Sequence, residues 1–313
     1  MGYQINLSKD ITTFDVFKIS LPMMVSALSN HFMIILDQVI LSRYSIEAMT
    51  GAASASVWCA TLQCAAMSIT SISGAFVGNY NGTKKYNLAG NPVWQMIWGS
   101  LGLFAVSVPL SMMAGRYCIP ENLKTEGLPY FRILMFCVPI TGVYNSLASF
   151  FISIGKGYIV TISAFLTNII NVCLDIILVF GYFGINTLKG SVGAATGTVS
   201  AWVSSVVILF VFFLGKKTRN RYGTFNFKLN ISRLKEYLKL SIAGGVGHAL
   251  EFSAWGVVYY TLSSIGKETA LLQSIAVSVN TLLAFTAAGL EKGVMAITAN
   301  LLGAKLKHKI FSV

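Results

Sequence analysis

Long apolar stretches, separated by short clusters of charged residues, Gly, Asn and Pro, fill nearly the whole of this 313-residue chain. A helix needs roughly 20 mostly apolar residues to cross a bilayer. Eight stretches are long enough: residues 14–41, 47–78, 92–115, 127–154, 157–182, 190–215, 234–264 and 269–302. Because they are continuous and do not alternate with period two, membrane helices are preferred to the strands of a β-barrel. The sequence predicts an all-α polytopic membrane protein.

The composition supports this fold class, since 55% of the residues are hydrophobic, 11% are charged and the mean hydropathy is +0.68. An ordinary soluble domain does not have such values. The first stretch has no small-residue cleavage site after it, so we expect it to be retained as a membrane helix and not removed as a signal peptide.

The net charge of +12 comes from bases in a few connecting loops, without the interleaved aromatic residues of a nucleic-acid groove. When eight helices are threaded alternately, most bases fall on one side: Lys84, Lys85, Lys156, the run 216–239, Lys305, Lys307 and Lys309. The excess of bases on cytoplasmic loops identifies that side. We therefore expect a multi-pass protein of the cell's inner (plasma) membrane with a cytoplasmic N-terminus and no nucleic-acid partner.

The cysteines and histidines do not suggest an enzyme. The five cysteines, at positions 59, 64, 118, 137 and 173, form no CxxC pair and join no histidine at a metal-ligand spacing. His31, His248 and His308 belong to no Ser/His/Asp arrangement. We expect neither catalysis nor a bound cofactor.

An ungapped shift of 221 residues aligns the last two stretches with the first two. It pairs Lys18 with Lys239, Asn79 with Asn300 and Gly82 with Gly303. Both copies end alike, with GNYNGTKK at 78–85 and ANLLGAKL at 299–306. Parallel repeats of this kind build the halves of several transporters. The predicted organisation is a six-helix lobe over 1–215, a basic cytoplasmic linker over 216–233 and a partial second lobe over 234–313, with a natural eight-helix protein as the alternative.

Four acids fall within predicted spans: Asp37, Asp175, Glu251 and Glu291. A charge at bilayer depth costs at least about 2.5–3.5 kcal/mol, so such acids are functional candidates. The only base well inside a span is Lys292. An acid without a fixed basic partner must be protonated, hydrated or paired with a mobile cation, as a proton- or sodium-coupled carrier requires. A neutral acid bonded to a neighbouring helix is the alternative for any one of them.

Asn171 and Asp175 stand four residues apart and so share a helix face, with Asn168 one turn earlier. Carboxylate and amide oxygens suit a hard cation such as sodium, although a polar clasp between helices remains open. Trp255 and Tyr259 surround Glu251, and an aromatic-lined acidic cavity would suit lipophilic cations, unless these rings are ordinary core. No role follows for Glu291 or Lys292, and the small-residue run GSVGAATG at 190–197 indicates close helix packing only.

Several sequence segments, in this order along the chain, resemble the MATE (multidrug and toxic compound extrusion) family. They are SLPMMVSALSNHFMIILDQVIL, YNSLASFFISIGK, FLTNIINVCLDIILVFG and GSVGAATGTVSAW. The resemblance implies one complete six-helix lobe and the first two helices of a second. It further implies a cation site, for Na⁺ if the protein is sodium-coupled, at Asp37, Asn171, Asp175 and Thr198, with the Ala194 carbonyl, and it matches Glu251 to the seventh-helix acid of the NorM-like branch.

The resulting hypothesis is a Na⁺- or H⁺-coupled antiporter that exports organic cations and drugs across the bilayer, with Glu251, Trp255 and Tyr259 serving substrate or coupling. Two alternatives stay open. One is a truncated remnant or partner-dependent subunit that does not transport. The other is a flippase for lipid-linked precursors, which should have a basic cavity. The drugs, the coupling ion and the oligomeric state do not follow from the sequence.

Overall fold

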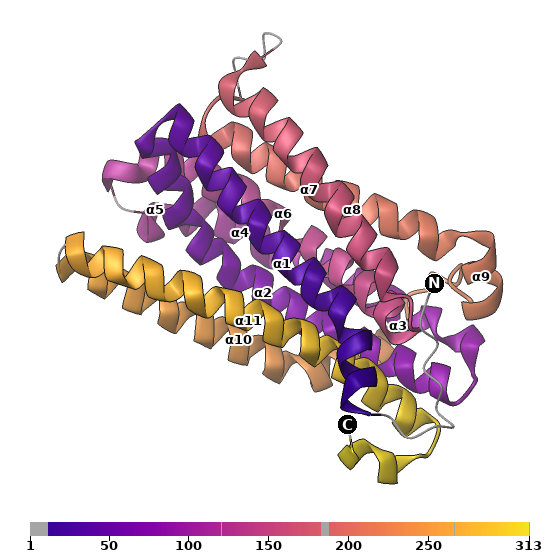
Figure 1. Ribbon diagram of the computed structural model, residues 1–313. Coiled ribbons are helices and arrows are strands. Elements are labelled where there is room, and N and C mark those ends of the chain that lie inside the picture. The colour runs from indigo at the N-terminus through magenta and orange to yellow at the C-terminus, as the bar shows by residue number, and fades with distance from the viewer. Residues whose placement is uncertain (1–11, 120, 183–187, 266, 313) are drawn as a thin grey trace.

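The computed structural model describes residues 12–119, 121–182, 188–265 and 267–312. Every regular element in these ranges is an α-helix or a 3₁₀-helix, which confirms the predicted fold class. Figure 1 shows the long helices side by side in a bundle, with short helices and loops gathered toward its ends. Such a bundle satisfies backbone hydrogen bonds inside each helix, as the bilayer interior requires.

Six segments among the described residues are long and apolar enough to cross a membrane, and they coincide with the first six predicted spans. They are Phe14–Tyr44, Ile46–Gly82, Tyr86–Met113, Lys124–Ser153, Gly157–Phe180 and Ser191–Leu214. The corresponding helices are α1 (Thr13–Tyr44), α2 (Ile46–Gly82), α3 (Gly90–Gly102) with α4 (Phe104–Met113), α6 (Lys124–Ser153), α7 (Gly157–Phe180) and α8 (Ser191–Leu214). The seventh and eighth predicted spans form α10 (Ile231–Ile265) and α11 (Lys267–Gly303), which are not among these six.

The third predicted span is not one continuous helix. It divides into α3 and α4 at Leu103, whose N–H donates to the carbonyl of Ser100 at 3.0 Å in the tighter 3₁₀ pattern. Gly102 ends α3, and Pro109 in α4 has no N–H to continue the ladder. The short helix α5 (Gly115–Cys118) follows.

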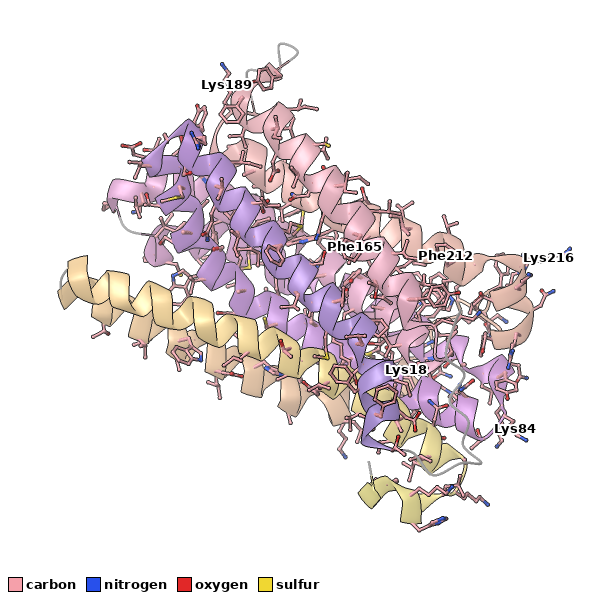
Figure 2. The ribbon with its side chains drawn as sticks, viewed as in Figure 1. Lys18, Lys84, Phe165, Lys189, Phe212 and Lys216 are labelled. Carbon is pink, nitrogen blue, oxygen red and sulfur yellow. The ribbon has the colours of Figure 1, made fainter. Side chains whose placement is uncertain are left out.

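The basic residues separate between the ends of the bundle as the alternate threading predicts. Figure 2 shows Lys18, Lys84 and Lys216 toward one end and Lys189 at the other. The short helices η1 (Tyr86–Leu88) and α9 (Lys216–Tyr222) lie at the first of these ends, here called the basic end. Assigning the basic end to the cytoplasm stays a prediction from loop charge.

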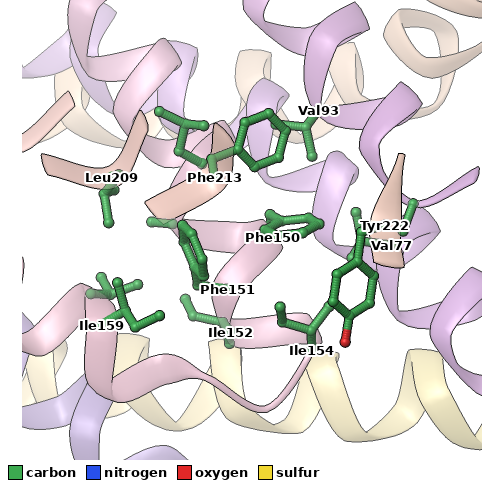
Figure 3. Close-up of a cluster of buried hydrophobic side chains, with 14 of the residues drawn as sticks. Val77, Val93, Phe150, Phe151, Ile152, Ile154, Ile159, Leu209, Phe213 and Tyr222 are labelled. Atoms are coloured by element: carbon green, nitrogen blue, oxygen red, sulfur yellow. The ribbon is translucent and has the colours of Figure 1, made fainter. Parts of the chain in front are cut away.

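A cluster of buried aromatic side chains joins α6, α8 and α9 near the basic end (Figure 3). Phe150 of α6 meets Phe213 of α8 edge to face, with ring centroids 4.9 Å apart. It meets Tyr222 of α9 in the same way at 5.5 Å. Edge-to-face pairs are favoured by the ring quadrupoles, so the end of α8 and the following turn are fixed against α6.

The internal repeat is confirmed by the helix bounds. A shift of 221 residues carries α2 onto α11 from first residue to last. Lys84 and Lys305, which correspond under that shift, are the two non-glycine residues in the described chain with positive φ, at 61° and 62°. The packing is exchanged between copies, because α1 lies along α11 and α2 lies along α10.

The two copies meet most closely at the C-terminal ends of α2 and α11. A Cβ added to Gly82 would lie 2.1 Å from the carbonyl oxygen of Asn300, and one added to Gly303 would lie 2.2 Å from that of Asn79. The Asn300 side chain accepts a 2.7 Å bond from Asn81 and donates a 2.9 Å bond to the carbonyl of Ser153. The junction therefore combines a close backbone contact, which the glycines make possible, with the hydrogen-bonded side-chain amide of Asn300.

We predict that Gly82→Ala destabilises the protein by about 1–3 kcal/mol, because the added methyl group forces two backbones apart. Gly303→Ala should have a similar effect from the opposite side. Gly247→Ala is the matched control, since a Cβ at that position of α10 meets nothing within 4 Å. Thermal unfolding in detergent measures the difference, and equal melting temperatures for all three variants would contradict the prediction.

Candidate cation site

Three helices bring the predicted cation ligands together. Asp37 comes from α1, Asn171 and Asp175 come from α7, and Thr198 comes from α8. All four side chains are buried, and Asn171 and Asp175 have no exposed surface. Residues more than 130 positions apart in the chain therefore converge on one interior point.

The four side chains lie next to one another in the order Asn171, Asp175, Asp37 and Thr198. The amide of Asn171 donates to Oδ2 of Asp175 at 3.3 Å. The carboxyl groups of Asp175 and Asp37 lie close enough to interact. The Thr198 hydroxyl lies 3.4 Å from Oδ2 of Asp37 and 3.0 Å from the carbonyl oxygen of Ala194, so its single hydrogen serves one of them. Two carboxylates in contact repel, so a proton or another cation must lie between them.

Three oxygens of this cluster are buried and have no hydrogen-bond partner. They are Oδ1 of Asp37, Oδ1 of Asn171 and Oδ1 of Asp175. A buried polar atom without a partner costs about 1–3 kcal/mol, so three such oxygens at one point are unusual in a region with a purely structural role. Oxygen atoms of this kind are the ligands that hard cations take.

Neither carboxyl group has a basic partner among the residues that the structure describes. The two salt bridges in the described part of the chain join Lys124 to Glu121 and His248 to Glu251. The described residues also hold no group of three or more His, Cys, Asp or Glu. The site is thus a two-carboxyl site with neutral amide and hydroxyl neighbours, a modest negative charge that suits a monovalent ion.

Two further residues shape the site and were missed in the sequence. A Cβ added to Gly197 of α8 would lie 1.8 Å from Oδ1 of Asp175, so this glycine makes room for the carboxyl group. The sequence showed it only as part of a small-residue run. Tyr130 of α6 is buried and lies within electrostatic range of Asp37 and Asp175. Nothing in its spacing to the acids distinguished it from other core aromatics.

Asn168 lies beside the cluster and has a different task. Its amide donates to the carbonyl and hydroxyl oxygens of Ser29 on α1, at 2.7 and 2.5 Å. It thereby joins α1 to α7 one turn from Asn171.

A groove of about 580 Å³ runs between α1 and α7 next to the site. Its walls are apolar apart from Ser29 and Asn168, and they include Leu36 and Val172, the chain neighbours of Asp37 and Asn171. Phe165 of α7, labelled in Figure 2, is another wall residue and is half exposed. None of the four side chains of the cation site is among its wall residues, and the wall residues Phe32 and Ile169 are more than half exposed.

Glu251 is not part of this cluster. It is exposed on α10, where its carboxylate lies 3.3 Å from Nδ1 of His248. Trp255 is also exposed, at 48%. The side chain of Tyr259 lies outside the described residues. The described residues thus do not show an aromatic cavity closing around Glu251.

Lys292 of α11 has a partner in the first lobe. Its amine lies 3.5 Å from Oδ1 of Asn145, whose amide donates to the carbonyl of Met67 and the hydroxyl of Thr70. Glu291 is exposed, on another face of the same helix. The lysine therefore joins α11 to α6 and, through Asn145, to α2.

The sequence matches the MatE family over residues 22–177, about half of the chain. A probable multidrug resistance protein NorM of Listeria monocytogenes serotype 4b (strain F2365) is 25% identical over 271 residues, which cover 84% of this chain and 59% of the relative. The chain thus spans less than two thirds of the length of the first curated relatives that it matches.

Solved structures share the fold. An outward-facing multidrug resistance MATE family transporter of the MOP superfamily superposes with a TM-score of 0.77 at 17% identity, covering 95% of this chain and 67% of that one. The eukaryotic MATE transporter AtDTX14 gives 0.78 at 20% identity, covering 95% and 68%. These structures show the shared fold, and the family match over residues 22–177, which include Asp37 and Asp175, identifies the chain as a member of the MATE family.

Proposed function

We propose that this chain exports organic cations or drugs across the membrane and that the driving ion, Na⁺ or H⁺, binds between Asp37 and Asp175. The observation that carries the proposal is the buried pair of neighbouring carboxyl groups, together with three oxygens that have no hydrogen-bond partner among the described residues. The curated relatives are named as multidrug resistance proteins, which supports drugs as the substrate class.

The residues present fit a sodium ion as well as a proton. For sodium, Asp37, Asp175 and Asn171 supply carboxylate and amide oxygens, and the hydroxyl of Thr198 is close enough to add another. For a proton, the carboxyl pair alone suffices, because one shared proton removes the repulsion. The same pair of carboxyl groups can therefore bind either coupling ion.

Occupancy of the pair would control the position of α1. With a cation or a shared proton present, Asp37 is attracted to Asp175 and α1 stays against α7 and α8. Without it, two buried negative charges repel, and separation or hydration of the carboxylates becomes favourable. Movement of α1 would then change the width of the groove between α1 and α7, which is where an apolar cation would lie.

The buried pair of carboxyl groups favours this function over transport of an anionic lipid-linked precursor. Such a substrate needs several basic groups around its phosphates. The bases that the structure places inside the bundle include Lys292 of α11, which is bonded to Asn145, and Arg132 of α6, whose Nε is buried, and neither is a member of a group of bases.

We predict that Asp37→Asn abolishes efflux without lowering the amount of protein in the membrane, because the amide keeps the shape but not the charge. Fluorescent dye efflux from cells lacking their own exporters measures the effect. Glu47→Gln removes an exposed acid at the start of α2 and is the matched control. Undiminished efflux by Asp37→Asn would exclude the proposed role, and no efflux by the unaltered chain would exclude export by the chain alone.

We predict that sodium chloride raises the melting temperature of the purified chain more than choline chloride does if Na⁺ is the coupling ion. At ten times the dissociation constant, the stabilisation is about 1.4 kcal/mol. Asp175→Asn should remove the difference between the two salts. Identical melting curves in both salts for the unaltered protein would instead identify H⁺ as the coupling ion.

We predict that Gly197→Ala lowers the efflux rate by about tenfold, equivalent to 1.4 kcal/mol, because the methyl group displaces the carboxyl group of Asp175. Gly102→Ala is the control, since a Cβ there meets nothing within 4 Å. Normal efflux by Gly197→Ala would show that the carboxyl group of Asp175 need not lie in this position.

A further inference from the structure

A group of three bases at the basic end takes no part in the proposed cation site. Lys156 lies between α6 and α7, while Lys217 and Arg221 belong to α9, which follows α8. Lys156 is half-buried, and the other two are exposed. Burial, and after it the charges of Arg221 and Lys217, lower the pKa of Lys156 below its usual value. The chain neighbours of these bases also meet, because Ile154, before Lys156, and Tyr222, after Arg221, belong to one buried cluster (Figure 3). The positive charges therefore gather at one place.

No acid balances them in the described part of the chain. Its two salt bridges both lie elsewhere, one between Glu121 and Lys124 at the start of α6 and one on α10. Like charges held together without a counter-charge destabilise a fold, so this arrangement is expected where an anion binds.

Arg221 is held in a fixed orientation. Its guanidinium carbon lies 4.8 Å from the ring centre of Tyr86 and 5.4 Å from that of Tyr222. Tyr222 is only 3% exposed and packs on Phe150. Stacking on aromatic faces leaves the planar donor fork of arginine available for a phosphate.

The segment after Arg221 is anchored as well. Gly223 has φ of +63°, and a Cβ there would lie 2.2 Å from the carbonyl oxygen of Asn87. Thr224 donates to the carbonyl of Phe213 at 2.7 Å and accepts the indole N–H of Trp94 at 2.7 Å. A preorganised group of donors binds without the cost of ordering it first.

Aromatic residues place this group at the depth of the lipid headgroups. Phe225 and Phe227 are more than half exposed although they lie in a polar connection. Trp98 donates its indole N–H to the carbonyl of Phe227 at 2.9 Å. Aromatic residues with a polar contact mark the boundary between hydrocarbon and water.

We propose that Lys156, Lys217 and Arg221 bind the phosphate group of an anionic phospholipid. Arg221 supplies a planar pair of donors and the two lysines supply point charges. A lipid fits better than a soluble phosphate because the exposed ring of Phe225 lies in the segment that follows Arg221, 5.3 Å from the guanidinium carbon of Arg219 on the same short helix, and would contact the acyl region. Basic pockets between membrane helices bind anionic headgroups in this way.

The test titrates phosphatidylglycerol and phosphatidylcholine into the purified full chain in detergent and follows binding by microscale thermophoresis. Phosphatidylglycerol should bind more tightly. Each base near an anionic lipid contributes about fivefold in affinity, so we expect Lys156→Gln/Arg221→Gln to bind it about 25-fold more weakly. The control, Lys189→Gln, removes an exposed base at the opposite end of the bundle and should change the affinity less than about twofold.

Two outcomes would overturn the proposal: equal binding of phosphatidylglycerol by the double variant and the unaltered chain, and binding of inorganic phosphate as tight as that of the lipid, which would identify a soluble ligand. If the double variant does not give a single peak on size exclusion, Lys217→Gln replaces it. That side chain is exposed, so its loss should leave the fold intact and weaken lipid binding about fivefold.

Discussion

The contact between the carboxyl groups of Asp37 and Asp175 is the constraint on which the arrangement of the first lobe depends. It brings α1, α7 and α8 to one point, with Thr198 on the third helix. Such a pair is stable at bilayer depth only with a proton or a cation between the two groups. The close approach of α8 at Gly197 follows from the need to accommodate the carboxyl group without a side chain in its way.

The repeat supplies the scaffold but not a second copy of this site. Under the shift of 221 residues, α2 and α11 have the same bounds, yet the position of Asp37 corresponds to Val258 in α10. The acid of α10, Glu251, corresponds to Asn30 in α1 and is exposed. The two copies therefore share their close packing at Gly82 and Gly303 and differ where charge is buried. This is expected if both copies kept the residues that pack the helices together, while the acidic residues changed separately in each copy.

The sequence predicted the helical membrane fold, the first six spans and the repeat, because apolar length and glycine-lysine endings are local patterns. Comparison with the family of transporters also confirms that the chain is not an enzyme. The meeting of Asp37 with Asp175 could not be derived from spacing and came from resemblance alone. Gly197 and Tyr130 were missed because their roles depend on which residues face them across helices, and the division at Leu103 was missed because hydropathy does not register a local 3₁₀ turn.

The proposed ion site and the proposed lipid site lie on the same two helices, α7 and α8. Lys156 immediately precedes α7, and α9 immediately follows α8. These two helices also meet through the hydroxyl groups of Thr167 and Ser205, 2.7 Å apart, and through the backbone contact of Gly193 with Leu178. By contrast, α1 is joined to α7 by side chains that reach its carbonyls, from Thr161 to Pro22 and from Asn168 to Ser29. Hydrogen bonds of this kind can be replaced by hydrogen bonds to water. A close backbone contact at a glycine separates less readily. A lipid bound across the ends of α7 and α8 would therefore hold the fixed part of the ion site, and α1 would be the part that moves.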